Sequence, residues 1–338
     1  MIYPKFLKPG DTIGICAPSD GARPDDPTVD VSLNHLRDEG YNIVEMPNVR
    51  TGHSPSADID TRVKEFNELM RRDDINFILS AAGGDMIMEL LPYIDEEAII
   101  ENIKNNKMKW MSGFSNPTIF LYYLTTKYDV ATIYGINMGS FGYKNLHKSL
   151  QDGLRLIKGD IPVLENFDKC QRISFEEEGE NGDNDLILNT DTKWLTPNGD
   201  VDVEGRLIGG CIDTLIFYQG TRFDYTKDFI ERYKDDGIIW YFDNFALSVE
   251  DLYSELWTLR EMGWFKYAKG FIFSRTMFES SRSGASYSEG IQRALGNKIP
   301  IIVDSDISHI KPRFSIINGC MAHVKASNGK GTIEMKLI

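Results

Sequence analysis

Residues 109–124 read KWMSGFSNPTIFLYYL, and this stretch decides the fold class. Its apolar opening is typical of a short buried strand, and its close is typical of a helix. Gly113 permits a sharp turn between the two, and Pro117 suits the first helical position because its missing N–H loses no hydrogen bond there. A strand that turns tightly into a helix is a building unit of α/β proteins, so we expect a parallel sheet covered by helices.

The residues around this stretch repeat the same alternation. Strands are predicted at 13–17, 42–46, 77–81, 109–112 and 131–135, and amphipathic helices at 31–38, 61–71, 86–105 and 117–127. Such alternation implies βαβ units with helices on both faces of the sheet. Ligands of these sheets bind beyond the carboxyl ends of the strands, so the loops that follow the strands are the candidate sites.

Residues 165–204 interrupt the alternation. They hold 12 acidic and three basic residues, a net charge of −9 out of −14 for the whole 338-residue chain. A structureless loop of this length inside a compact domain would be unusual. We therefore interpret the segment as an acidic connection with a small hairpin or an ordered loop. It divides the chain into an N-terminal α/β domain at 1–164 and a C-terminal domain at 205–338.

The C-terminal domain is predicted to be mixed. Strands are expected at 206–210, 237–242, 270–273 and 300–303, helices at 212–219 and from Ser248 onward, and an antiparallel pair at 315–325 and 332–337. Ser248 has Asp251 three residues later, a variant of the capping box that starts helices. The antiparallel pair is joined by SNGKG, which favours a tight turn.

Charge and composition exclude several classes of partner. Acidic residues outnumber basic ones 51 to 37, and there is no basic block, so nucleic acid and anionic lipid are not expected partners. No stretch is apolar enough for a membrane span, and the N-terminus lacks the apolar region of a signal peptide, so we expect a cytoplasmic protein. The four cysteines lie far apart without a C-x-x-C pair, so we expect reduced thiols, no metal site and no cofactor.

Ser115 is the candidate nucleophile. Its place between strand and helix resembles a nucleophile elbow, which holds a serine above the sheet at a helix N-terminus. The backbone N–H of Asn116 would then face a developing oxyanion, helped by the helix dipole. The alternative is structural, because Ser-Asn before Pro is also ordinary N-cap chemistry.

A nucleophilic serine needs a base and an acid that orients the base. Of the five histidines, His309 differs because DSDISHIKPRF places it in a loop directly after a predicted strand. Asp243 ends the strand GIIWYFDN, again at a carboxyl end, where it could accept the Nδ1–H of His309. The structural alternatives are a solvated histidine and an aspartate that forms a turn.

Gly83 and Gly84 follow another strand, in the segment SAAGGD at 80–85. Glycines let a backbone approach a ligand closely, so a second oxyanion N–H could come from this loop. A phosphate cradle is the rival interpretation, but neither G-x-G-x-x-G nor G-x-x-x-x-G-K is present.

Together these residues resemble the LD-carboxypeptidase family, which includes the microcin C immunity proteins. The resemblance covers nearly the whole chain, and its motifs occur in the family's order. They are the opening LKPGDTIGICAPS, Arg62, the segment AAGGDMIMELLPYID, the turn GFSNPT, the segment EGRLIGGCIDTL, and the strand and loop PIIVDSDISH.

The resemblance implies a Rossmann-like or flavodoxin-like N-terminal domain, a smaller mixed α/β C-terminal domain, and a homodimer. It also implies Ser115 as nucleophile, His309 as base, and the N–H groups of Gly84 and Asn116 as oxyanion donors, with Gly83 beside the substrate. Asp243 stands where the family usually has Glu, one methylene longer, and Glu250 is the fallback acid.

Three further positions bear on the substrate. Asn116 replaces the family's Asp after the nucleophile, and Cys211 replaces the Asn of a Gly-Gly-Asn segment where substrate would bind. Trp194 precedes the G-x-L-x-G-G strand, where microcin immunity members carry a tryptophan that stacks on a nucleobase. An aromatic face stacks on any base, but Trp194 could equally pack its loop onto the domain.

The functions implied differ in class. One is a serine carboxypeptidase or amidase that cleaves an L,D-peptide bond of a muropeptide, and its variant hydrolyses peptidyl or aminoacyl nucleotides. Another is a muropeptide-binding protein whose catalysis is weakened by the changes at Asn116, Cys211 and Asp243. A secreted solute-binding protein is a third, against which the missing signal peptide counts.

Overall fold

The first of two large β-sheets carries the N-terminal half of the chain. The computed structural model describes residues 1–173 and 185–338. The sheet has the order β13-β5-β4-β3-β1-β2, and its five N-terminal strands are parallel, as predicted. These strands are β1 (Thr12–Cys16), β2 (Asn42–Glu45), β3 (Phe77–Ser80), β4 (Trp110–Gly113) and β5 (Thr132–Tyr134).

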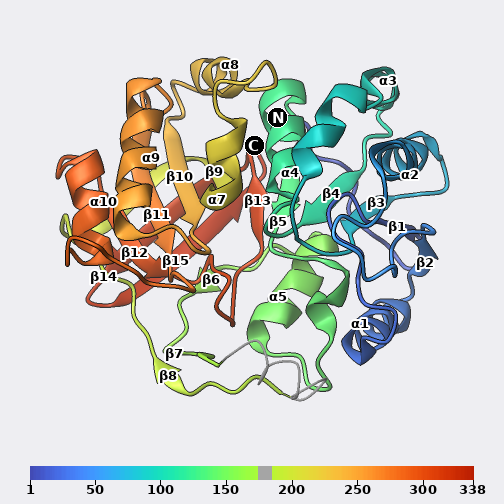
Figure 1. Ribbon diagram of the computed structural model, residues 1–338, viewed down its shortest axis with the longest axis horizontal. Helices are drawn as coiled ribbons and strands as arrows, with labels where there is room; N and C mark the ends of the chain where they lie inside the picture. The colour runs from blue at the N-terminus through green and yellow to red at the C-terminus, as the bar shows by residue number, and fades with distance from the viewer. Residues whose placement is uncertain (174–184) are drawn as a thin grey trace.

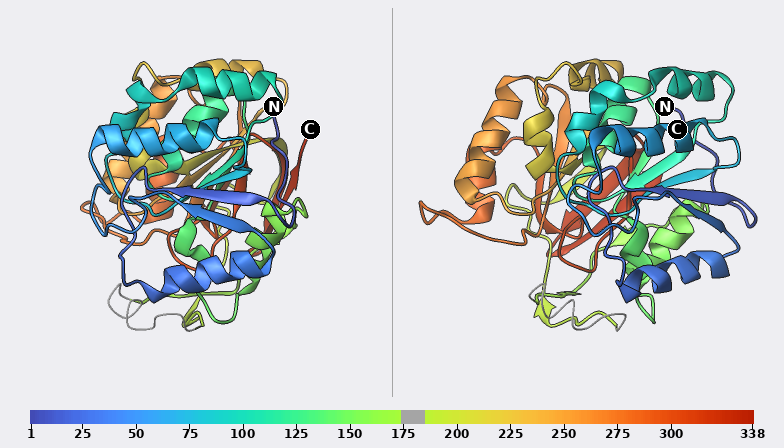
Figure 2. Two further views of the ribbon diagram at one scale, coloured as in Figure 1. Left: turned by 90° about the vertical axis from the view of Figure 1, so that its right-hand side faces the viewer. Right: turned by 45° about the vertical axis from the view of Figure 1, so that its right-hand side comes forward.

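Helices cover both faces of this sheet. In Figure 2, α2 and α3 lie on one face, and α1 and α5 lie on the other. Their bounds are α1 (Pro27–Asp38), α2 (Ile59–Arg71), α3 (Glu96–Lys104) and α5 (Lys148–Ile157). None of the helices within 1–173 and 185–338 is long and apolar enough to cross a membrane.

Two helix predictions need correction. The single helix expected at 86–105 is a 3-10 helix, η1 (Ile87–Tyr93), followed by α3, because Pro92 lacks an N–H to continue the first helix and Asp95 caps the second. The helix expected to be amphipathic at 117–127 is α4 (Thr118–Tyr128), which is buried on all sides. It contacts elements of both halves and lies between them in Figure 1.

The second sheet carries most of the C-terminal half and has the order β12-β11-β10-β9-β14-β15-β6. Strands β9 to β12 are parallel, whereas β14, β15 and β6 are antiparallel to their neighbours. Their bounds are β6 (Leu164–Glu165), β9 (Val201–Cys211), β10 (Ile238–Asp243), β11 (Ala268–Ser274), β12 (Ile301–Ser305), β14 (Met321–Ser327) and β15 (Lys330–Lys336).

Four further helices belong to this half. They are α7 (Ile212–Tyr218), α8 (Thr226–Arg232), α9 (Val249–Glu261) and α10 (Tyr287–Leu295). The Ser248 hydroxyl accepts a hydrogen bond from the backbone N–H of Asp251, so it caps α9 as its sequence predicts. Asn328 and Gly329 have positive φ angles in the tight turn between β14 and β15, as SNGKG predicts.

The two halves exchange strands. The segment expected at 315–325 is divided, and its first part, β13 (Ile316–Asn318), pairs antiparallel with β5 at the edge of the first sheet. In the other direction, β6 pairs with β15 in the second sheet. A strand of the C-terminal half therefore completes the sheet that carries the Ser115 turn. This strand pairing ties the two halves together.

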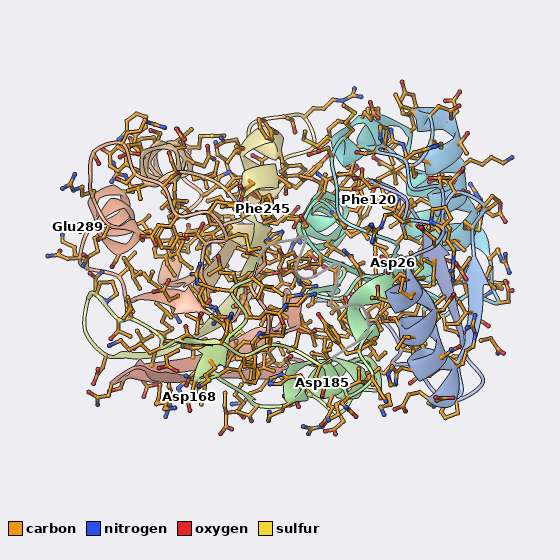
Figure 3. The ribbon with its side chains drawn as sticks, turned by 60° about the horizontal axis from the view of Figure 1, so that its bottom comes forward. Asp26, Phe120, Asp168, Asp185, Phe245 and Glu289 are labelled. Atoms are coloured by element: carbon orange, nitrogen blue, oxygen red, sulfur yellow. The ribbon has the colours of Figure 1, made fainter. Side chains whose placement is uncertain are left out.

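The acidic connection contains a short antiparallel strand pair made of β7 (Lys169–Cys170) and β8 (Thr190–Asp191). Its residues 174–184, which carry part of the predicted acidic excess, lie outside the described residues. Asp168 pairs with Lys330 of the second sheet, and Asp185 accepts a hydrogen bond from Asn145 of the N-terminal half. In Figure 3, Asp168 and Asp185 lie along the same edge of the molecule.

Candidate active site

Ser115 lies in a sharp turn after β4. Its φ angle of 69° is in the left-handed region, which is strained for a residue with a side chain. Gly113 makes the turn possible, because a Cβ there would stand 2.5 Å from the Cβ of Pro117. No side chain caps α4, so the structure does not support the alternative in which Ser-Asn serves only as an N-cap. The Ser115 hydroxyl makes no hydrogen bond to any described residue.

Asn116 and Gly83 are the neighbours of Ser115 in this turn. The amide oxygen of Asn116 accepts hydrogen bonds from the Ser19 hydroxyl (2.6 Å) and the Ile87 backbone (3.3 Å). A Cβ on Gly83 would lie 3.0 Å from the Cβ of Ser115. The backbone N–H groups of Asn116, next to Ser115 in the chain, and of Gly84, next to Gly83, donate to no other residue within the described ranges.

Gly84 has a specific structural requirement. Its φ angle is +121°, and a Cβ there would lie 2.1 Å from Cγ of Asp20. Asp20 accepts a hydrogen bond from the hydroxyl of Ser54, and burial raises the pKa of its carboxyl group. Only glycine fits between this carboxyl group and the turn, which explains its presence without any reference to catalysis.

His309 lies in the loop that follows β12, with 11% of its side chain exposed. Its ring packs between Phe114, next to Ser115, and Phe245, with ring centroids 4.5 and 4.7 Å away. Nδ1 lies 3.0 Å from Oδ2 of Asp243, but the N–H does not point at this oxygen closely enough to form a hydrogen bond. Nε2 has no hydrogen-bond partner among the described residues.

Asp243 is fully buried at the end of β10. Its Oδ1 accepts a hydrogen bond from the backbone N–H of His309 (3.2 Å), and its Oδ2 accepts one from the hydroxyl of Tyr134 (2.7 Å). The carboxyl ends of β4, β10 and β12 thus bring Ser115, Asp243 and His309 into one region. This is the arrangement that their positions after strands predict.

The fallback acid, Glu250, has a different role. Its carboxylate accepts hydrogen bonds from the backbone of Arg282 (3.1 Å) and Ser283 (2.8 Å). Hydrogen bonds from Ser283 and Arg282 hold its pKa well below the usual range. Glu250 therefore orders the loop at 281–283, whereas Asp243 is the carboxylate beside His309.

Two predicted substrate contacts are not supported. Trp194 is 1% exposed, and its indole N–H donates to Oδ2 of Asp306 (2.8 Å). Its ring therefore packs the connection onto the domain, the alternative that the sequence left open, and presents no face to a base. Cys211 is also buried, and burial raises the pKa of its thiol far above the ordinary value. It is not placed to contact a substrate.

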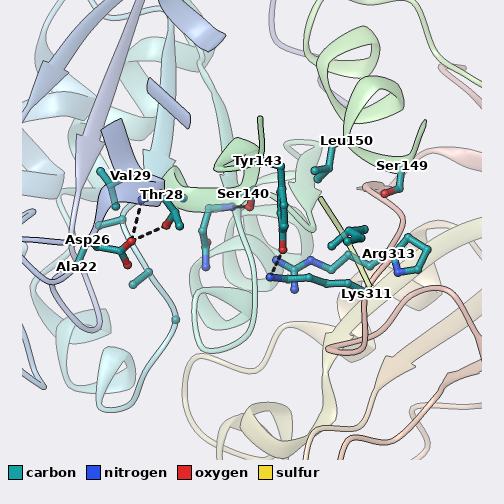
Figure 4. A pocket seen from close by; sticks show the side chains of 17 residues that line it. Ala22, Asp26, Thr28, Val29, Ser140, Tyr143, Ser149, Leu150, Lys311 and Arg313 are labelled. Atoms are coloured by element: carbon teal, nitrogen blue, oxygen red, sulfur yellow. Dashed lines mark hydrogen bonds between the residues drawn. The ribbon is translucent and has the colours of Figure 1, made fainter. Parts of the chain in front are cut away.

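A pocket of about 250 Å³ borders Gly83 (Figure 4). On one side, Lys311 donates a hydrogen bond to the hydroxyl of Tyr143 (2.6 Å), and Arg313 lies 3.7 Å from the centre of the Phe114 ring. On the other side, Asp26 accepts hydrogen bonds from the N-terminus of α1. The pocket therefore combines two basic groups with one carboxylate next to the turn that carries Ser115.

Sequence reasoning missed Arg275, which holds the His309 loop. Arg275 is 2% exposed and pairs with the fully buried Asp306. It also donates to the carbonyl groups of Ile310 (3.2 Å) and Pro312 (2.9 Å). Arg275 and Asp306 each follow a predicted strand. Because the same signal singled out His309, it could also have found these two residues.

Asp213 was missed as well. Its carboxylate accepts hydrogen bonds from the backbone N–H groups of Phe245 and Ala246, both at 2.8 Å. It thereby fixes the turn that places Phe245 against His309. Burial raises the pKa of Asp213. No sequence signal marks it, because an Asp near the start of a helix is common.

Replacing Arg275 with methionine is expected to lower the free energy of unfolding by about 3–5 kcal/mol, because Asp306 would be left as a buried, uncompensated charge. Urea unfolding would measure this loss. The matched control is Arg282→Met, which removes an arginine that is 67% exposed and pairs with Asp251 at the surface. Equal effects of the two replacements would contradict this role of Arg275.

No group of three or more His, Cys, Asp or Glu side chains within 1–173 and 185–338 could hold a metal ion. The candidate site consists of Ser115, His309, Asp243 and the backbone N–H groups near them. A serine hydroxyl, an imidazole and a buried carboxylate are the groups that serine-type acyl transfer uses.

Comparisons with known proteins identify carboxypeptidases and a microcin immunity protein as relatives of this chain. Models of the LD-carboxypeptidase N-terminal and C-terminal domains match residues 13–135 and 204–324. A putative carboxypeptidase of Vibrio cholerae is 26% identical over 92% of this chain and 91% of its own. The microcin C7 self-immunity protein MccF of Escherichia coli is 27% identical over 95% of this chain and 92% of its own.

Solved structures show the same architecture. An MccF-like protein from Streptococcus pneumoniae, in complex with AMP, has a TM-score of 0.79 and 25% identity, and the match covers 96% of this chain and 99% of that one. The two domain models together span the regions that hold Ser115, Asp243 and His309. The chain therefore belongs to the LD-carboxypeptidase family.

Proposed function

We propose that this protein is a serine-type peptidase or amidase with Ser115, His309 and Asp243 as its catalytic triad. The observation that carries the proposal is the position of His309. Its ring lies against the residue before Ser115, with Nδ1 3.0 Å from Asp243 and Nε2 without a partner among the described residues. In this proposal residues 1–164 supply the nucleophile, and residues 205–338 supply the base and the acid.

The reaction begins when the hydroxyl oxygen of Ser115 attacks the carbonyl carbon of the amide. Nε2 of His309 takes the hydroxyl proton, and Asp243 at Nδ1 stabilises the imidazolium that forms. No hydrogen bond joins Ser115 and His309 in the ligand-free structure. Such bonds are often long before substrate binds and tighten in the Michaelis complex.

The tetrahedral intermediate carries its negative charge on the former carbonyl oxygen. The N–H groups of Gly84 and Asn116 would hold this oxyanion. Asn116 directly follows Ser115, Gly84 directly follows Gly83, which lies against Ser115, and neither N–H donates elsewhere in the described part of the chain. His309 then gives its proton to the leaving amine, and the C–N bond breaks. Water attacks the acyl-enzyme, again with His309 as base, and releases the acid and the free serine.

By family membership, the substrate is a muropeptide in which an L-residue is joined to a terminal D-alanine. The pocket beside Gly83 supports this choice, because Lys311 and Arg313 line it and are suited to a carboxylate. A peptide that ends in D-alanine carries such a group next to the bond that is cleaved.

Hydrolysis of a peptidyl or aminoacyl nucleotide is the second candidate. It is supported by the similarity to the microcin C7 self-immunity protein and to a protein solved with AMP. The argument from Trp194 does not add to it, because this ring is buried against Phe314 and Asp306. A binding protein with weakened catalysis is the third candidate.

Incubation with two substrates distinguishes these candidates. The purified protein and its Ser115→Ala variant are each incubated with an L,D-tetrapeptide and, separately, with an aminoacyl-sulfamoyl adenosine, and products are identified by mass. We expect the wild type to release alanine from the tetrapeptide. Cleavage of the adenosine compound alone would establish the second candidate. Tight binding of the tetrapeptide without product would establish the third candidate, a binding protein, and would overturn the catalytic role of the triad.

A further inference from the structure

Tyr134 connects the nucleophile's sheet to the acid. It is the last residue of β5, and its backbone pairs with Gly113 of β4, two residues before Ser115. On its other side it pairs with Ile316 of β13. Its side chain is 1% exposed, and its hydroxyl donates to Oδ2 of Asp243 at 2.7 Å. A single hydrogen bond thus joins the strand beside the nucleophile turn to the carboxylate in the second sheet.

The other contacts of Asp243 show what this bond controls. Oδ1 accepts the backbone N–H of His309, and Oδ2 faces both Nδ1 of His309 and the hydroxyl of Tyr134. With a donor on each oxygen, the carboxylate group has a defined rotation about its Cβ–Cγ bond. Without Tyr134, Oδ2 would keep only the histidine ring, whose N–H is not aimed at it.

We infer that Tyr134 is a positioning residue of the triad, which holds the Asp243 carboxylate in the rotation that keeps Oδ2 beside Nδ1 of His309. The inference rests on the proposed function. Tyr134 acts through Asp243 and does not touch the reacting atoms.

The protonation of Tyr134 supports this role. Burial and then the charge of Asp243 raise the pKa of its hydroxyl far above the ordinary value. The hydroxyl therefore keeps its proton throughout the working range, and it can only donate to the carboxylate. A permanent donor of this kind spreads the negative charge of Asp243 over one more group.

Other titratable groups surround the carboxylate. Besides Tyr134 and His309, the described side chains that interact electrostatically with Asp243 include Cys211, Asp213, Tyr241 and Tyr287. Burial raises the pKa of each of these four groups. Replacing the Tyr134 hydroxyl leaves all four in place, so a change in kcat reports on the loss of that hydroxyl.

The test is Tyr134→Phe, with Tyr122→Phe as the matched control. Tyr122 is equally buried, and its hydroxyl bonds to Thr226 at 2.9 Å, away from Asp243. Both variants lose one buried hydroxyl bond. We expect Tyr134→Phe to lower kcat for the cleaved substrate about 10- to 100-fold with an unchanged KM, the effect of one lost charge-assisted hydrogen bond.

Thermal stability provides a second readout. Tyr134→Phe and Tyr122→Phe each lose one buried hydroxyl bond, so both are expected to lose some thermal stability. Tyr122→Phe should nevertheless keep the kcat of the wild type, because its hydroxyl does not contact Asp243.

Two results overturn the inference. One is a kcat of Tyr134→Phe within twofold of the wild type, and the other is a loss of kcat equal to that of Tyr122→Phe. The proposed function fails separately, if Ser115→Ala retains the activity of the wild type. Loss of activity in Ser115→Ala with full activity in Tyr134→Phe would therefore reject the positioning role alone.

Discussion

Ser115→Ala is expected to lower kcat by about four to six orders of magnitude, because alanine has no oxygen to form the acyl-enzyme. Stability should change little. The side chain is partly exposed, its hydroxyl bonds to no described residue, and alanine meets the same backbone strain at a φ of 69°. Turnover of the cleaved substrate, measured beside thermal unfolding, would check both statements.

Ser112→Ala is the control for this experiment. Ser112 lies in β4, just before the turn that carries Ser115, is fully buried, and donates to the carbonyl of Ile136 at 2.9 Å. Its replacement is expected to cost about 1 kcal/mol of stability but to preserve kcat. If Ser115→Ala keeps a tenth or more of the wild-type kcat while remaining folded, Ser115 is not the nucleophile.

Asp243→Asn is expected to lower kcat by about four orders of magnitude, even though the side chain keeps its size. The amide oxygen can still accept the backbone N–H of His309. The amide nitrogen would then face both the Tyr134 hydroxyl and Nδ1 of His309. Because two N–H donors cannot face each other, His309 would place its proton on Nε2, where it can no longer accept the proton of Ser115. The change is measured as kcat at saturating substrate.

Glu250→Gln is the natural control, since Glu250 is the other acid that the sequence offers. Its oxygens serve the loop at 281–283, and glutamine keeps one oxygen as acceptor. We expect an unchanged kcat. A large loss in Glu250→Gln together with a small one in Asp243→Asn would exchange the assignments of the two acids.

Local sequence patterns predicted most of the first sheet. Apolar runs of four or five residues marked β1 to β5, and the strand boundaries agree within one or two residues. Gly113 and Pro117 marked the nucleophile turn, because only certain residues tolerate the backbone angles of a tight turn. These signals are local, so they do not depend on the rest of the chain.

Long-range packing could not be predicted in the same way. Strand β13 reads like the start of a C-terminal hairpin, yet it pairs with β5 of the first sheet. Trp194 has the position of a base-stacking residue, but its indole meets Asp306, 112 residues later. Pairings of this kind depend on which surfaces meet in the folded chain, and no local pattern encodes that.

The sequence by itself determined the α/β class, the sharp turn that carries Ser115, and the positions of His309 and Asp243 after strands. These properties follow from side-chain periodicity and from the backbone angles that glycine and proline favour. Only the tertiary structure decided that Asp243, not Glu250, lies beside His309, that Trp194 is buried, and that the Tyr134 hydroxyl donates to Asp243. Each of these depends on contacts between residues far apart in the sequence, which form only when the two sheets pack around α4.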